Sequence, residues 1–364
     1  MNAISIIVLI FSLLGALDRI LGNRFGLGRE FERGFELFSA MAMTMIGLIV
    51  LAPVFGAWLS PLLNGFYEIF HIDPSIIAAL LLANDMGGAS LATELARDPQ
   101  IGGYCALVVS SMMGCVISFT IPFATGIVNP SQHKDLFFGF LCGIITIPVG
   151  CFVSGFLCGL TLWEILLTLL PLLLICIALA LGIVLAPNGC VKVFRGFGTL
   201  MKVLATIGLA IGIFTFLTGK TVFPEMDVLE EGARICVSAC ITLSGAFPLM
   251  YVVGKLLKRP MSALGRCFGV NATAALGFIP TLVTNATTYG MMRDMDRRGV
   301  VLNAAFTVSA AFVFGSHLGF TMGYDAAYTV PVIVGKLISG VCAVVLAAFL
   351  FKDDSKANAE KESS

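Results

Sequence analysis

Long apolar segments fill most of this chain of 364 residues, and their lengths restrict it to one class of fold. A helix needs about 20 residues to cross the hydrocarbon core of a bilayer. With 58% hydrophobic residues, 12% charged residues and a mean hydropathy of +0.98, the chain is predicted to be an all-α polytopic membrane protein. Nine segments reach spanning length, at about 3–21, 37–58, 103–128, 136–160, 163–186, 199–219, 234–257, 300–321 and 326–351.

Two further segments, 76–98 and 270–292, are apolar but interrupted by polar residues. Lys and Arg concentrate on the cytoplasmic side of a membrane, so their distribution distinguishes crossing segments from re-entrant ones. If both segments cross, the two sides carry 10 and 11 basic residues; if both re-enter, they carry 18 and 3, with Lys336 left inside a span. The sequence therefore predicts nine transmembrane helices and two re-entrant or broken segments, with the N-terminus outside and the C-terminus in the cytoplasm.

The chain also resembles two diverged halves, offset by about 195 to 200 residues. The first half, 1–186, holds the first interrupted segment and a connecting span, and the second half, 187–351, holds the other interrupted segment. Under the nine-span topology the halves are inverted repeats, a plan common among secondary transporters. The alternative is a chance match between spans rich in small residues. The polar end, 352–364, is predicted to be a disordered cytoplasmic tail.

The first interruption, in LLANDMGGAS, places an acid at membrane depth. An ionised carboxylate there costs a few kcal/mol unless water, a cation or a hydrogen-bond donor meets it, so Asp85 is a candidate substrate-binding residue. Asn84 can donate and accept hydrogen bonds, and Gly87 permits a tight turn. The alternative is that Asp85 only caps the helix that follows; the two roles can coexist, because a capped carboxylate keeps free lone pairs.

The second interruption, in TLVTNATTYG, contains no acid but several neutral hydrogen-bonding side chains. Its candidate substrate-binding residues are Thr284, Asn285, Thr287 and Thr288. One anionic group facing neutral donors and acceptors suits a small monovalent cation that bears a hydroxyl. The alternative is that the threonines bond to the backbone of their own helix and only bend it.

His317 is a lone histidine near the end of the span that starts at 300. Such a residue is either structural or, at the edge of a cavity, responsive to pH. The chain has three histidines and eleven cysteines, and no two cysteines form a C-x-x-C pair, so we expect no metal or cofactor site. The sequence also contains no ATP-binding loop and no hydrolase motif. We therefore expect a transporter and no catalytic residues. The alternatives are a membrane-embedded enzyme acting on an amine or lipid head group, and a non-catalytic membrane subunit.

The balance of 22 basic and 22 acidic residues gives no field that would attract nucleic acid. The expected surroundings are a lipid bilayer and a small-molecule substrate. The sequence does not give an oligomeric state, and a homo-oligomer is one option.

Several strings of this sequence resemble the ethanolamine utilisation permease family, EutH. They are LLANDMGGASLATELA (81–96), SMMGCVISFTIPFATGIVNPS (111–131), GIITIPVGC (143–151), GMMRDMDRRGVVLNAAFTVSAAF (290–312) and HLGF (317–320). The resemblance covers nearly the whole chain in the same order, and it implies a bacterial inner-membrane protein that imports ethanolamine. Protonated ethanolamine is a small cation with a hydroxyl. The family pattern has Cys where this chain has Asn84 and Asp where it has Ser316, so the resemblance leaves Asp85 as the partner of the ammonium and weakens a role for His317 beside a second acid.

Overall fold

The computed structural model describes residues 3–351, apart from the side chains at 64, 66, 262 and 264. Every regular element in that range is helical, which confirms the predicted all-α membrane protein. The predicted tail, 352–364, lies outside the described residues.

Eight helical stretches in the described range are long and apolar enough to cross a membrane. Many of their leucine, isoleucine and phenylalanine side chains are exposed, as expected for helices whose outer faces contact lipid. Seven contain one long helix each: α1 (Ala3–Ile20), α3 (Phe38–Phe70), α8 (His133–Leu157), α9 (Leu162–Leu185), α10 (Pro187–Thr218), α11 (Leu229–Phe268) and α16 (Thr329–Leu350). The eighth is built from α6 (Pro99–Tyr104), η2 (Cys105–Gly114), η3 (Val116–Thr120) and α7 (Ile121–Ile127). Short helices precede two of the long ones: α2 (Leu27–Glu36) before α3, and η4 (Pro130–Gln132) before α8.

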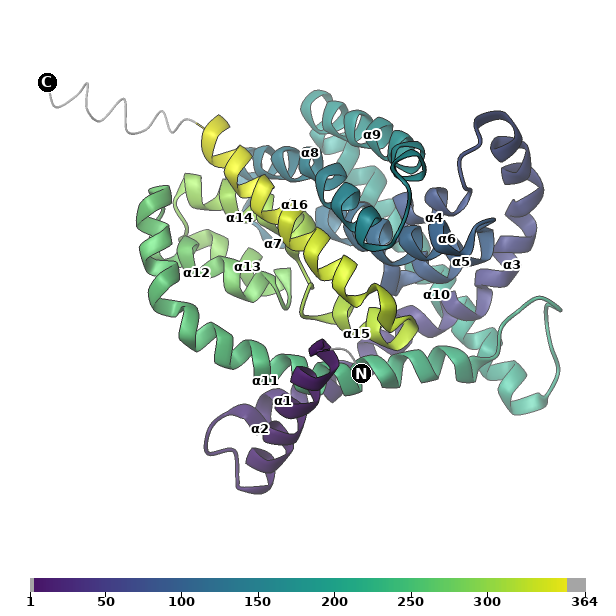
Figure 1. The fold of residues 1–364 in the computed structure, drawn as a ribbon, viewed down its shortest axis with the longest axis horizontal. Coiled ribbons are helices and arrows are strands. Elements are labelled where there is room, and N and C mark those ends of the chain that lie inside the picture. Colours follow the sequence, from purple (N-terminus) through teal and green to yellow (C-terminus); the bar gives the residue numbers. More distant parts are fainter. Residues whose placement is uncertain (1–2, 352–364) are drawn as a thin grey trace, which may run out of the picture.

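The long helix α11 runs along one side of the molecule and curves at its end toward α12 (Figure 1). It contains Pro248 and Pro260, and proline inside a helix removes a backbone hydrogen bond and allows a bend. α16 crosses the middle of the molecule in the view of Figure 1, and it packs against α8 through small residues. A side chain at Gly150 would meet the carbonyl oxygen of Gly335, and Ser154 Oγ donates a hydrogen bond of 2.8 Å to the Pro331 carbonyl. Small residues allow this close approach of two membrane helices.

Both interrupted segments are broken helices, as the sequence predicts. The first consists of α4 (Ser75–Leu81), η1 (Asn84–Met86) and α5 (Gly88–Leu95). The second consists of α12 (Ala272–Thr281), α13 (Asn285–Met291) and η5 (Met292–Asp294). In the view of Figure 1 the first segment lies to the right of α16 and the second to its left. That both segments re-enter the membrane stays a prediction.

The expected continuous span at 300–321 is also broken, so this part of the prediction is wrong. The chain forms α14 (Arg297–Ala310), a non-helical turn, α15 (Ser316–Tyr324) and then η6 (Ala326–Tyr328). In the turn, the backbone N–H groups of Phe312 and Phe314 donate to the carbonyls of Thr281 (3.2 Å) and Leu282 (2.8 Å). The turn thus supplies hydrogen-bond donors to the carbonyl groups at the end of α12, which have no partner within that helix. The cause of the break is therefore a tertiary contact, which cannot be read from the local sequence.

The first broken segment is bonded to an irregular neighbour in a similar way. η2 and η3 are π-helical, a form that is rare and often found at functional sites. Ser110 Oγ donates to the Leu82 carbonyl (2.5 Å), and Ser118 Oγ accepts from the Ala83 N–H (3.2 Å). Each helix break is therefore held by a neighbour that is not a regular α-helix. The division into two repeat halves stays a prediction.

Candidate functional site

A cavity of about 480 Å³ lies where the two broken segments approach each other. Its wall comes from six regions: α2 with the start of α3, the tip around η1, the start of η3, the middle of α11, the tip before α13, and the turn before α15. Four of the eight predicted site residues line it, namely Asp85, Thr284, Thr287 and His317. The structure thus brings together residues from three segments that are far apart in the sequence.

Asp85 supplies a carboxylate to this cavity. It lies in η1, and its side chain is 16% exposed, whereas the neighbouring Asn84 is fully buried. α5 begins at Gly88 without a side-chain cap, so Asp85 does not serve as the capping residue considered from the sequence. The Ser316 hydroxyl is within hydrogen-bonding reach of the carboxylate, and His317 Nε2 lies 3.8 Å from Asp85 Oδ1. The carboxylate therefore keeps acceptor capacity for a ligand.

A buried lysine lies behind this part of the wall. Lys336 is 1% exposed, and its Nζ donates a hydrogen bond of 2.6 Å to the Ser111 carbonyl in η2. It is close enough to Asp85 for their charges to interact, although the two do not form an ion pair. Sequence reasoning left this lysine without a role, yet a basic residue inside an apolar span is itself a sign of function.

The second tip contributes hydroxyls and no charge. Thr284 precedes α13, and its Oγ1 accepts a hydrogen bond of 3.4 Å from the Ala286 N–H. Thr287 lies one turn further along and is exposed to the cavity. Both side chains can therefore offer a hydroxyl oxygen or hydrogen to a bound molecule.

The other four predicted residues do not line the cavity. Gly87 is a buried turn residue with φ +83°, and an added Cβ would lie 2.8 Å from Leu48 Cβ. Thr288 Oγ1 donates to the carbonyl of Gly277 (3.0 Å), so this hydroxyl joins α13 to α12 and does not bond to its own helix. Asn285 is fully buried, and among the described residues its side chain reaches only the Tyr289 hydroxyl, at 3.5 Å.

Asn84 is the most unusual of these buried residues. It is fully buried, and neither its amide oxygen nor its amide nitrogen has a hydrogen-bond partner among the described residues. Leaving such groups unpaired costs about 1 to 3 kcal/mol each. The Asn84 side chain would gain hydrogen bonds if a water molecule entered beside it or if the tip moved.

Aromatic rings complete the cavity, and the sequence analysis did not identify them. Phe119, Phe247 and Phe312 all line the wall. The rings of Phe119 and Phe312 pack edge to face at 5.7 Å, and the Phe312 ring lies 5.1 Å from that of His317. Phe312 has φ +64°, an unusual value for a residue other than glycine. Aromatic faces attract organic cations.

The same cavity offers little to a metal ion. Within residues 3–351, no group of three or more His, Cys, Asp and Glu side chains is placed to hold one. A basic residue, Arg33, lies at the wall, but its charge is engaged by Glu30 (3.3 Å) and by the ring of Phe247, 5.4 Å away. The arrangement combines one carboxylate, hydroxyls and aromatic faces, which suits a small organic cation.

Comparisons with known proteins identify the family of this chain. The family model described as "Ethanolamine utilisation protein, EutH" matches residues 1–350. The chain is 42% identical to the "Probable ethanolamine permease EutH" of Listeria monocytogenes over 356 residues, which cover 98% of this chain and 95% of the relative. It is 36% identical to the protein of the same name from Salmonella typhimurium, over 98% of this chain and 97% of the relative.

A third relative, the "Uncharacterized protein YxeR" of Bacillus subtilis, is 39% identical over 96% of this chain and 94% of its own length. No solved structure matches the chain. Since the family model and the relatives cover nearly its whole length, this chain belongs to the EutH family of ethanolamine utilisation proteins.

Proposed function

We propose that this protein carries protonated ethanolamine, or a close small amino alcohol, across the bacterial inner membrane. The observation that carries the proposal is Asp85, whose carboxylate faces the cavity without capping a helix and without an ion pair to lysine or arginine among residues 3–351. An ammonium group would pair with that carboxylate and lie against the ring of Phe312. The substrate hydroxyl would then exchange hydrogen bonds with Thr284 or Thr287. Relatives named as probable ethanolamine permeases support this assignment.

The test is uptake of isotope-labelled ethanolamine into vesicles that contain only the purified protein. We expect saturable uptake that unlabelled ethanolamine competes and that empty vesicles lack. Absence of saturable uptake by correctly folded protein would contradict the transporter proposal. Mass spectrometry of the vesicle contents gives the second readout, because a transporter delivers the amine chemically unchanged.

The geometry of the cavity disfavours the alternative of an amine-modifying enzyme. A serine nucleophile needs a neighbouring base to remove its proton. Ser316 is instead oriented toward Asp85, and His317 Nδ1 has no hydrogen-bond partner among the described residues. The contact between serine and histidine that serine hydrolases use is therefore not formed between Ser316 and His317 Nδ1. Conversion of the amine in the vesicle assay would support the enzyme instead.

The orientation in the membrane is part of the same proposal. The distribution of basic residues supports an external N-terminus, a cytoplasmic C-terminus and two inverted halves whose broken segments enter from opposite faces. Single cysteines introduced into a cysteine-free variant at Arg29, Lys220 and Arg293 test it with a membrane-impermeant thiol reagent. We expect labelling from outside at 220 only. External labelling at 293 would show that the second broken segment crosses the membrane.

A further inference from the structure

A second, smaller pocket of about 150 Å³ lies between α3, α5, α11 and α15. Its wall includes three acids, Glu94, Asp227 and Glu231. Glu231 is bonded to Arg234 through two contacts of 2.5 and 2.9 Å. Within the described part of the chain, neither Glu94 nor Asp227 forms a salt bridge, and their two charges are close enough to interact. Neighbouring carboxylates repel each other unless a cation lies nearby.

This acidic pocket and the main cavity are lined by the same four elements of the fold. On α3 and α15 the pocket residue lies on the same helix face as the cavity residue, four and seven positions further along, whereas on α11 it precedes the cavity residue by twelve positions and lies on another face. At 1.5 Å per residue, the two sites are separated by roughly 10 Å along α15. The pairs of lining residues, with the cavity residue first, are Met45 and Ile49 on α3, Asp85 and Glu94 on the first broken segment, His317 and Tyr324 on α15, and Phe247 and Ile235 on α11.

Buried hydroxyls mark the path between the two sites. Thr321 is fully buried and lies on α15 between His317 and Tyr324, one turn from each. Ser90 is 8% exposed, lines the acidic pocket and lies one turn before Glu94. By hydrogen-bond geometry, neither the Thr321 nor the Ser90 hydroxyl has a partner in the part of the chain that the structure describes, although Ser90 lies near the Tyr324 hydroxyl. Because an unpaired buried hydroxyl is costly, these groups indicate a polar ligand that meets them in another state.

The path is closed in this conformation. Tyr324 OH donates a hydrogen bond of 3.0 Å to Thr93 Oγ1, which joins α15 to α5 beside the acidic pocket. Deeper in, Cys236 Sγ lies 4.0 Å from Met45 Sδ, and both residues are buried. The main cavity and the acidic pocket are therefore separate in this conformation, an arrangement compatible with alternating access in a transporter.

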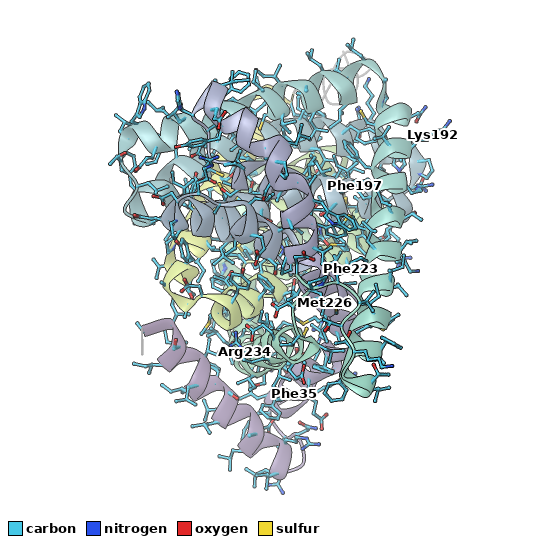
Figure 2. All side chains as sticks on the ribbon, turned by 90° about the vertical axis from the view of Figure 1, so that its right-hand side faces the viewer. Phe35, Lys192, Phe197, Phe223, Met226 and Arg234 are labelled. Carbon is cyan, nitrogen blue, oxygen red and sulfur yellow. The ribbon has the colours of Figure 1, made fainter. Side chains whose placement is uncertain are left out.

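The mouth of the acidic pocket lies at the connection between α10 and α11. Asp227 belongs to this connection, and its backbone N–H donates a hydrogen bond of 3.1 Å to the Val50 carbonyl of α3. In the view of Figure 2, Arg234 lies nearer to Phe35, Met226 and Phe223 than to Lys192, which lies near the start of α10. By the distribution of basic residues, this connection lies outside the cell, so the pocket is predicted to face the external solution.

We propose that this acidic pocket is a second binding site for a protonated amine, at the opposite end of the transport path from Asp85. The inference rests on the proposed transport function. Glu94, Asp227 and Glu231 do not form a group placed to hold a metal ion, which favours an organic ammonium whose hydrogens reach separate oxygens. The amine binds between Glu94 and Asp227 and passes along the Ser90 and Thr321 hydroxyls when the Tyr324 contact opens.

Uptake kinetics in vesicles test the site with variants that change its charge in both directions. We expect Glu94→Gln combined with Asp227→Asn to raise KM about fivefold with little change in maximal rate. Arg234→Gln leaves Glu231 unpaired and should lower KM, a gain that general damage to the fold does not produce. The matched control is Glu230→Gln, an exposed acid on the first turn of α11 outside the pocket. Wild-type KM in both charge variants would overturn the second site.

A binding measurement separates this inference from the transport proposal. Scintillation proximity with labelled ethanolamine is applied to detergent-solubilised Asp85→Asn protein, in which the main site is disabled. We expect residual weak binding that the Glu94→Gln and Asp227→Asn changes remove. No residual binding in Asp85→Asn would overturn the second site, while wild-type uptake that depends on Asp85 would still uphold transport. Residual binding unaffected by the two changes would also overturn it.

Discussion

The two broken segments meet at one cavity, but they differ in charge and in how their polar groups are satisfied. The first tip presents Asp85 to the cavity, beside an Asn84 side chain that no described residue bonds. The second tip presents Thr284 and Thr287 and contains no acid. Under the proposed function, the first tip would recognise the positive charge of the substrate and the second its hydroxyl.

The second tip is also the better bonded of the two. Thr281 and Thr288 share a hydrogen bond of 2.7 Å, and the Tyr289 hydroxyl donates to Thr307 Oγ1 at 3.0 Å. Such connected networks hold side chains in one arrangement. The first tip has no comparable internal network among the described side chains and is bonded instead by Ser110 and Ser118 of its π-helical neighbour. We infer that a bound cation orders the first tip more than the second.

Asp85→Asn should have the largest effect of any change at the two tips. The substitution keeps the shape of the side chain and removes its charge, so the ammonium loses its ionic partner. Losing one partner of a close charge pair costs about 2 to 5 kcal/mol, which corresponds to a rise in KM of roughly 30-fold or more. The measurement is uptake of labelled ethanolamine at neutral pH, where the amine is protonated.

The control for this change is Glu68→Gln, which neutralises an exposed acid on α3 away from the cavity. It should leave uptake unchanged. Asp85→Glu keeps the charge and should retain more uptake than Asp85→Asn. If Asp85→Asn protein of normal thermal stability shows wild-type saturation, the carboxylate does not pair with the ammonium, and the difference between the two tips is structural only.

Gly87→Ala should have an intermediate effect, because the backbone at this tip is in a left-handed conformation. Gly87 has φ +83°, and the added Cβ would lie 2.8 Å from Leu48 Cβ. The left-handed conformation alone costs an alanine roughly 1 to 2 kcal/mol, so we expect a lower midpoint of thermal unfolding and reduced uptake. The measurement is the unfolding midpoint in detergent, followed by uptake.

Gly290 provides the matched control in the second broken segment. It lies within α13, and an added Cβ would contact nothing within 4 Å. Alanine at such a helical position is favoured over glycine by about 0.5 to 1 kcal/mol, so Gly290→Ala should be neutral or stabilising. Equal loss of stability in the two alanine variants would mean that the first tip is no more constrained than the second.

Local sequence patterns were sufficient for most of the fold. Segment length and hydropathy predicted the all-α membrane class, and the polar interruptions predicted both broken helices. The break between α14 and α15 was missed, because the run AAFVF before Gly315 contains no helix-breaking residue. Its cause is the pair of backbone hydrogen bonds to the end of α12, which depends on a neighbour distant in sequence.

Four of the eight predicted site residues line the cavity, and the other four do not, because residue type does not determine packing. Charge and hydrogen-bonding capacity can be read from residue type, so Asp85 and the threonines were found. Which side of a short helix faces the cavity depends on packing, so the sequence did not separate Thr287 from Thr288. Nothing in the local sequence set Phe119 and Phe312 apart from the other phenylalanines, and the structure brings these two rings to the cavity wall.

The smallest expected effects come from replacing Thr287 or Thr288 of the second tip by valine, and they should differ between the two residues. Thr287→Val removes a hydroxyl that faces the cavity, and we expect KM to rise about fivefold, since a neutral hydrogen bond contributes about 1 kcal/mol. Thr288→Val removes a hydroxyl bonded to the Gly277 carbonyl and should lower the unfolding midpoint with little change in KM. Uptake kinetics and thermal unfolding of both variants are the measurements. A KM effect confined to Thr288→Val would mean that α13 turns when substrate binds, so that the well-bonded tip, and not the Asp85 tip, is the one that rearranges.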